Sequence, residues 1–158
     1  MKILLSLCLS AAFAATVMAI PQTITSPTVL LNGRNVEQFA STPASWSPNA
    51  GLPGPWSAPA ADGTQTLTDK TSVFGIPAAE VQATRSSDRL TRMRVVFRDS
   101  GKDRHTLLTR VSQGIAAFTG HPAREEGHDA KVFHYEKTQI RATSGHEGEV
   151  VVDFTPAP

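Results

Sequence analysis

The chain has 158 residues, of which 40% are hydrophobic and 18% charged, and its formal net charge at pH 7 is +1. A near-neutral total argues against general nucleic-acid binding, which depends on a sustained basic surface. The only cysteine is Cys8, so the chain beyond it cannot contain an intramolecular disulfide, a thiol nucleophile or a cysteine metal site.

The first residues have the pattern of a cleavable secretory signal peptide, residues 1–19. Lys2 supplies a positive charge, residues 3–18 are apolar or small, and Val17-Met18-Ala19 fits a signal-peptidase site. The apolar stretch is too short and too rich in alanine and serine to prefer spanning a bilayer. We therefore predict cleavage after Ala19 and a soluble secreted or periplasmic product with no remaining membrane span.

Residues 20–66 are expected to form an irregular lead that packs on the folded domain. Seven of the eleven prolines fall in this lead, and proline both fixes the backbone and removes a hydrogen-bond donor. Within it, residues 28–32 are typical of a strand, and residues 33–40 indicate a short turn or helix.

Both tryptophans, Trp46 and Trp56, lie in this proline-rich lead. They could form a platform for a sugar or a proline-rich peptide, because indole rings offer a large apolar face with one polar edge. Alternatively, they could cover the apolar face of a sheet. A single helix covers about 10 Å, whereas four strands span nearly twice that width, so the second interpretation is favoured.

Residues 79–85 and 91–98 alternate apolar and polar side chains, which predicts two strands that are each buried on one side. A hairpin must bring the apolar faces together, which places Val81 opposite Met93 or Val95. That register requires a loop of odd length, either residues 86–88 or residues 86–90.

Apolar residues at helical spacing predict an amphipathic helix over residues 103–118. Ser100 or Asp103 is suited to begin it, and Gly120 and Pro122 are suited to end it. Further strands are expected in residues 131–143 and 149–156, with a bulge or break near Lys137-Thr138 because the apolar residues change parity there.

These elements predict an α+β fold in residues 67–158: a small antiparallel sheet of two β-hairpins in the order ββαββ, with one helix on one face. The charges are unevenly distributed over the chain, since residues 85–120 carry eight basic and three acidic side chains. Arg92, Arg94 and Arg98 would share the polar face of one strand.

The arginine row is a candidate binding surface for an acidic partner, because guanidinium groups bond carboxylates in pairs. The competing interpretation is a water-facing strand neutralised across the sheet, with Glu80 opposite Arg94 and Gln82 opposite Arg92. Such cross-strand pairs are common.

A second candidate is a metal site made by His128, His134 and Glu136, whose imidazole and carboxylate groups suit divalent ions. No pair of histidines has the H-E-x-x-H spacing, and a solvated loop with incidental histidines is the favoured interpretation.

No nucleophile elbow, phosphate loop or dinucleotide fingerprint occurs in the sequence. We therefore expect an exported, non-enzymatic binding module without a cofactor, whose partner is a protein or an anionic ligand. The alternatives are a small metal-dependent or acid–base enzyme and a secreted enzyme inhibitor that uses the tryptophan loop.

Overall fold

A computed structural model describes residues 28–158 except residues 102 and 147, so the expected signal peptide and its cleavage site lie outside the described residues. The helices are α1 (Val36–Ser41), the 3-10 helix η1 (Pro43–Trp46) and α2 (Arg104–Thr119). The strands are β1 (Thr64–Thr66), β2 (Ser72–Val73), β3 (Ile76–Pro77), β4 (Glu80–Ser86), β5 (Arg89–Arg98), β6 (Arg124–Glu125), β7 (Ala130–Tyr135), β8 (Thr138–Ser144) and β9 (Glu149–Pro156).

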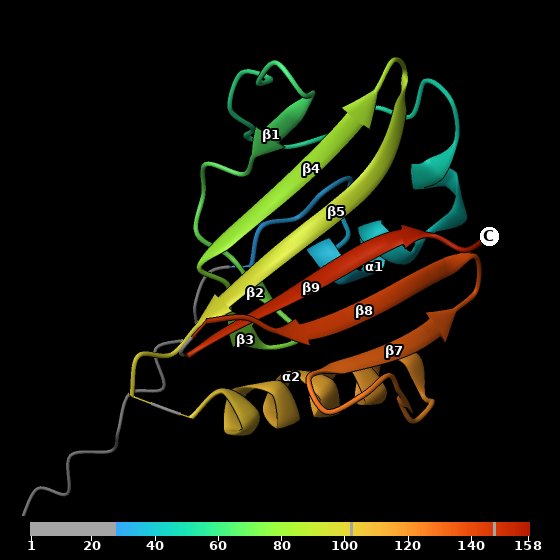
Figure 1. The fold of residues 1–158 in the computed structure, drawn as a ribbon. Helices are drawn as coiled ribbons and strands as arrows, with labels where there is room; N and C mark the ends of the chain where they lie inside the picture. Colours follow the sequence, from blue (N-terminus) through green and yellow to red (C-terminus); the bar gives the residue numbers. More distant parts are fainter. Residues whose placement is uncertain (1–27, 102, 147) are drawn as a thin grey trace, which may run out of the picture.

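The main structural feature is an antiparallel sheet with the strand order β1-β4-β5-β9-β8-β7-β6, and β2 and β3 form a separate small hairpin. The long helix α2 packs against β7, β8 and β9, while α1 lies behind the strands in Figure 1. This confirms the predicted α+β fold with an antiparallel sheet and one main helix on one face. No helix among the described residues has the length and apolarity needed to span a membrane.

The β4–β5 hairpin has the predicted register, with Val81 opposite Val95, but the predicted loop length is wrong. Only two residues, Ser87 and Asp88, separate the strands. A register shift follows Thr84, so that one residue of β5 is left over in the ladder. Because of this bulge, the two-residue loop gives the same kind of register as a loop of odd length would. The apolar faces of β4 and β5 therefore stay on the same side of the sheet.

The expected break near Lys137-Thr138 is confirmed, and it is a tight turn that reverses the chain between β7 and β8. Glu136 occupies this turn with φ of 51°. Because the two strands run in opposite directions, Phe133 and Ile140 lie opposite each other and are both buried. The switch of the apolar residues from odd-numbered to even-numbered positions therefore marks a hairpin.

Helix α2 agrees with its prediction: Asp103 caps the first turn through a hydrogen bond from the His105 amide, and Gly120 ends the helix with φ of 72°. The structure also explains Gly114 in the middle of the helix. A Cβ at this position would lie 2.9 Å from the Cβ of Phe74, so the glycine allows the β2–β3 turn to approach the helix closely.

Residues 28–32 do not form a strand, and this prediction was wrong. Leu31 makes a single bridge to Arg34, because the chain turns at Asn32-Gly33, where both residues have positive φ. Leu31 is nevertheless fully buried, so it is its apolar side chain, and not a ladder, that holds this segment on the domain.

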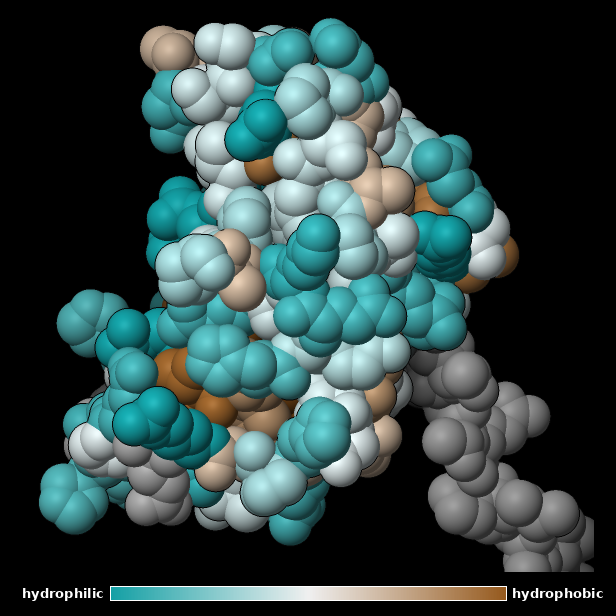
Figure 2. Space-filling model, turned by 90° about the vertical axis from the view of Figure 1, so that its right-hand side faces the viewer, coloured by the Kyte–Doolittle hydropathy of each residue, from teal (hydrophilic) through white to brown (hydrophobic). Residues whose placement is uncertain are grey.

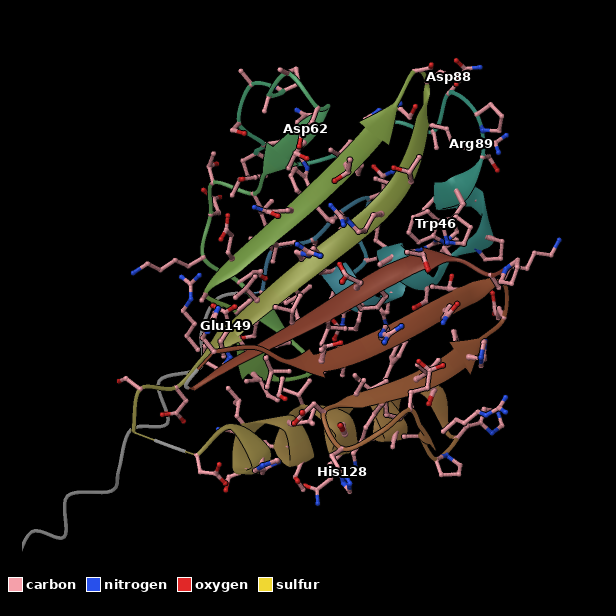
Figure 3. The ribbon with its side chains drawn as sticks, in the orientation of Figure 1. Trp46, Asp62, Asp88, Arg89, His128 and Glu149 are labelled. Atoms are coloured by element: carbon pink, nitrogen blue, oxygen red, sulfur yellow. The ribbon has the colours of Figure 1, made fainter. Side chains whose placement is uncertain are left out.

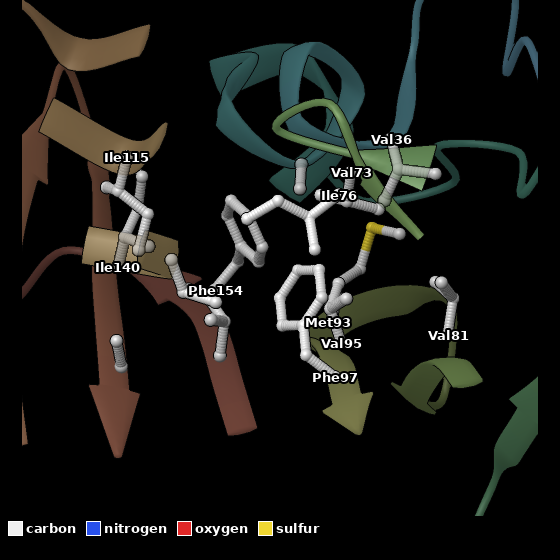
Figure 4. Packing of buried hydrophobic residues seen from close by; sticks show 14 of the residues in the cluster. Val36, Val73, Ile76, Val81, Met93, Val95, Phe97, Ile115, Ile140 and Phe154 are labelled. Carbon is white, nitrogen blue, oxygen red and sulfur yellow. The ribbon is translucent and has the colours of Figure 1, made fainter. Parts of the chain in front are cut away.

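α1 of the lead and the β2–β3 hairpin together cover the part of the sheet that α2 leaves open. Figure 4 shows Val36 of α1 together with Val73 and Ile76 of the β2–β3 hairpin beside Met93 and Phe97 of β5. All five belong to one continuous hydrophobic cluster. The lead therefore packs on the sheet as expected, but the β2–β3 hairpin, which lies outside the lead, shares the covering of this face.

Trp46 is part of this cover, with 7% of its surface exposed. Its indole Nε1 donates a hydrogen bond to Thr138 Oγ1 at 3.0 Å, which joins η1 to the start of β8 (Figure 3). Trp56 is half-buried, and its Nε1 donates to the carbonyl of Pro53 at 2.8 Å. The indole of Trp46 thus lies in the interior, whereas part of Trp56 reaches the surface.

Candidate functional site: the open face of the sheet

The candidate site is the face of the sheet that points away from α2, which we call the open face. Along β5, Met93, Val95 and Phe97 enter the core, so the alternating residues Arg92 and Arg94 project to the other side. In Figure 1 the long strands lie in front of α1 and the β2–β3 hairpin, and no described helix crosses the side that faces the viewer.

The arginine row is neutralised across the sheet, but by a strand other than the one predicted. Arg94 makes two hydrogen bonds to Asp153 of β9, at 2.9 Å from Nε and 3.2 Å from Nη2. Arg98 Nε bonds Glu149 of the same strand at 3.0 Å. On the β4 side, Gln82 is opposite Arg94.

The predicted pairing of Glu80 with Arg94 is wrong. Glu80 is opposite Val96 and instead accepts a hydrogen bond from Gln82 Nε2 at 2.8 Å. The ladder is offset by two residues from the arrangement assumed: the two-residue turn accounts for one residue and the bulge after Thr84 for the other. For the same reason Gln82 is opposite Arg94 and not Arg92.

The carboxylate of Asp153 is shared by two arginines of β5, Arg92 and Arg94. Arg92 Nε lies 3.9 Å from its Oδ1, and Arg141 of β8 is directly opposite it in the ladder. Arg141 makes its own ion pair to Glu126 at 3.4 Å. Hydrogen bonding to Asp153 raises the pKa of Arg94, so this pair is the tightly held one.

Arg92 is the least satisfied member of this group. Its Nε atom is buried, yet it has no hydrogen-bond partner among the described residues, and its contact with Asp153 is too long to be a hydrogen bond. Its side chain as a whole is 39% exposed. Arg92 Nε is therefore a buried hydrogen-bond donor without a partner among the described residues, next to the positively charged Arg94.

Apolar residues lie beneath the charged side chains of the open face. Val96 and Val132 point to this side of the sheet but are 6% and 2% exposed, respectively. Arg141 is opposite Val132, and long arginine side chains commonly cover apolar surface with their methylene groups. The valines are thus covered, and the open face presents mainly the polar ends of its charged side chains.

The structure does not bring the residues of the predicted metal site together into a ligand set. His134 is exposed on β7, Glu136 lies in the β7–β8 turn, and His128 lies in the loop that precedes β7 (Figure 3). Among the described residues, no group of three or more histidine, cysteine or acidic side chains is placed to hold a metal ion.

A groove that was not predicted from the sequence lies between α1, the end of α2 and the β7–β8 turn. It has a volume of about 460 Å³. The residues that line it come from three separate segments: Arg34, Gln38, Ser41, Thr42, Pro43, Phe118, Tyr135 and Glu136. No local motif joins these segments, so only the folded chain reveals the groove.

Comparisons with known proteins identify no relative. No family model matches the chain, and neither a curated protein nor a solved structure shows a significant similarity to it.

Proposed function

We propose that the protein is an exported binding module that holds a carboxylate-rich partner on the open face of its sheet. The observation that carries this proposal is that Arg92 and Arg94 share the carboxylate of Asp153, with Arg141 opposite Asp153 in the neighbouring strand. The signal-peptide pattern of residues 1–19 supports export.

Within this arrangement, Asp153 acts as a positioning residue. Its two hydrogen bonds hold the Arg94 guanidinium in one orientation, which reduces the entropy lost when a partner binds. Arg92 has only a long contact with Asp153, and Arg141 is half-exposed beside its partner Glu126; these two arginines contribute the donors that reach the partner.

A carboxylate of the partner suits these donors better than a neutral group does. Guanidinium groups form short, paired hydrogen bonds with carboxylates, and bonds to charged groups are about twice as strong as neutral ones. An incoming carboxylate would bond the exposed part of the Arg92 guanidinium, since Arg92 Nε itself is buried. The partner is therefore expected to be an acidic polypeptide that lies along the strands.

The proposal is tested with poly-L-glutamate as the probe, by isothermal titration of the purified protein. The double variant Arg92→Gln, Arg141→Gln removes two positive charges and should weaken binding about tenfold or more. Affinity should also fall as salt is added, because exposed charges are screened.

The matched control is Arg110→Glu, which lowers the net charge by two, as the double variant does, at an exposed position of α2 on the opposite side of the sheet. It should bind poly-L-glutamate as the unchanged protein does. Equal losses in both variants would indicate attraction by overall charge, and unchanged binding in the double variant would refute the site. Thermal melts of all variants check that the fold is retained.

A further inference from the structure

The groove between α1, the end of α2 and the β7–β8 turn has walls that are held in place by buried contacts. Thr138, which is fully buried, accepts a hydrogen bond from Trp46 Nε1 at 3.0 Å and lies 3.5 Å from the carbonyl oxygen of Ala40. These contacts tie η1 and α1 to the start of β8. The groove is therefore formed before any ligand arrives, as is usual for small-molecule sites.

One wall of the groove is aromatic. The rings of Phe118 and Tyr135 lie 5.1 Å apart at 44°, and both side chains are half-buried, so part of each ring remains at the surface. Phe74 supports Phe118 from behind, with ring centroids 5.7 Å apart. Figure 2 shows this side of the molecule, with an apolar patch bordered by hydrophilic side chains in its lower part.

The other groups that line the groove have unused hydrogen-bonding capacity. Gln38 Oε1 accepts from the Asn35 amide in the capping box, while its side-chain nitrogen has no partner among the described residues. Ser41 is 2% exposed, and its hydroxyl also lacks a partner within the described part of the chain. Buried hydroxyls without a partner are uncommon, and this one lies in the lining of the groove.

The charges that line the groove balance. Arg34 donates to Thr42 Oγ1 at 2.9 Å and makes no ion pair in the described structure, and Glu136 likewise makes none. One cation and one anion therefore face the same space without neutralising each other directly. A ligand with a net charge would gain from one of them and be repelled by the other.

We propose that this groove is a binding site for a neutral saccharide. A sugar ring has an apolar C–H face, which fits an aromatic wall, and hydroxyl groups that both donate and accept hydrogen bonds. Gln38 and Arg34 supply donors, Glu136 supplies acceptors, and the hydroxyls of Ser41 and Tyr135 supply both. The site is separate from the open face, so it does not depend on the function proposed above.

The experiment uses the fact that the chain contains one tyrosine. Incorporation of 3-fluorotyrosine gives a protein with a single ¹⁹F resonance, which reports directly on Tyr135 in the groove. Titration with cellobiose or maltose should shift this resonance and saturate. Glycerol at the same concentration of hydroxyl groups should leave it unmoved, because it has no ring to stack on the aromatic wall.

A conservative variant locates the binding. Gln38→Glu keeps the acceptor that caps α1 but removes the two side-chain donors, and it should weaken saccharide binding about tenfold. Gln113→Glu, the same change at an exposed position of α2 that lies outside the groove, should leave the affinity unchanged.

Three results would overturn the proposal. The first is that neither disaccharide shifts the ¹⁹F resonance. The second is that the disaccharides shift it equally in Gln38→Glu and in the unchanged protein. The third is that a zwitterionic probe such as glycylglycine gives a saturable shift and the disaccharides do not. Because the resonance reports the groove alone, failure here leaves the test of the open face unaffected.

Discussion

The two faces of the same strands have opposite surroundings. On the inner face, Met93 and Phe97 of β5 are fully buried under α2, α1 and the β2–β3 hairpin. On the open face, Arg92 and Arg94 alternate with them in the sequence and are partly exposed to solvent. The inner face of β5 contributes to stability, and its outer face belongs to the proposed binding surface. Substitutions on one face can therefore change one property without the other.

The largest expected effect is on the inner face, at Phe154 of the central strand β9. Phe154 is fully buried and stacks on Phe74, with ring centroids 6.0 Å apart. Phe154→Ala should lower the free energy of unfolding by about 3–5 kcal/mol, because it removes apolar contacts and leaves a cavity. Urea denaturation followed by tryptophan fluorescence measures this loss, and a loss below about 1 kcal/mol would contradict the packing described.

A second inner-face prediction concerns Gly114. In an exposed helix, glycine to alanine would stabilise by about 1 kcal/mol. Here the added methyl group would meet Phe74 at 2.9 Å, so Gly114→Ala should instead destabilise by about 1–3 kcal/mol. The sign of the change in the denaturation midpoint decides between the two outcomes.

The third prediction concerns Glu37, a polar residue buried on the inner side of α1 with 7% of its surface exposed. Burial raises the pKa of its carboxyl group, against the hydrogen bond that Oε1 accepts from the Phe74 amide at 3.2 Å. The folded state therefore holds this proton at a higher pH than the unfolded state does. Stability should fall as the pH rises from the ordinary pKa of glutamate, about 4.3, towards the raised value.

The variant Glu37→Gln keeps an acceptor for the Phe74 amide but cannot ionise. Its stability relative to the unchanged protein should therefore increase with pH across that window and then become constant. Denaturation curves at a series of pH values test this, and a constant difference between the two proteins at all pH values would show that Glu37 does not titrate with folding.

The smallest effect is expected on the open face, at the ion pair of Arg98 with Glu149. The Arg98 side chain is 58% exposed, and exposed pairs of this kind contribute about 0–1 kcal/mol. Arg98→Gln should thus change the unfolding free energy by less than about 1 kcal/mol. A loss as large as that of Phe154→Ala would mean that the open face also contributes to stability.

Local patterns in the sequence were sufficient to predict the parts of the fold that depend on near neighbours. The 3.6-residue spacing located α2 and its caps, and the alternation along β5 placed Arg92 and Arg94 on a polar face. The same reasoning failed at the β4–β5 turn, because alternation cannot distinguish a long loop from a short loop with a bulge.

The unpredicted features depend on contacts between distant segments. The partner of Arg94 is Asp153, 59 residues away, and nothing near either residue indicates that β9 inserts beside β5. The groove likewise joins Gln38, Phe118 and Tyr135 from three segments. Two residues of the candidate open face, Arg141 and Asp153, were missed for the same reason.

The position of β9 also has a consequence for the order of folding. The last strand of the chain lies between β5 and β8, so the sheet cannot be completed until residues 149–156 have been synthesised. Until then, β5 has no partner along that edge and its apolar residues stay exposed. Pairings so distant in sequence are slow to form. The β4–β5 hairpin can form early because its strands are adjacent in the chain, whereas the complete sheet forms only once β9 is available.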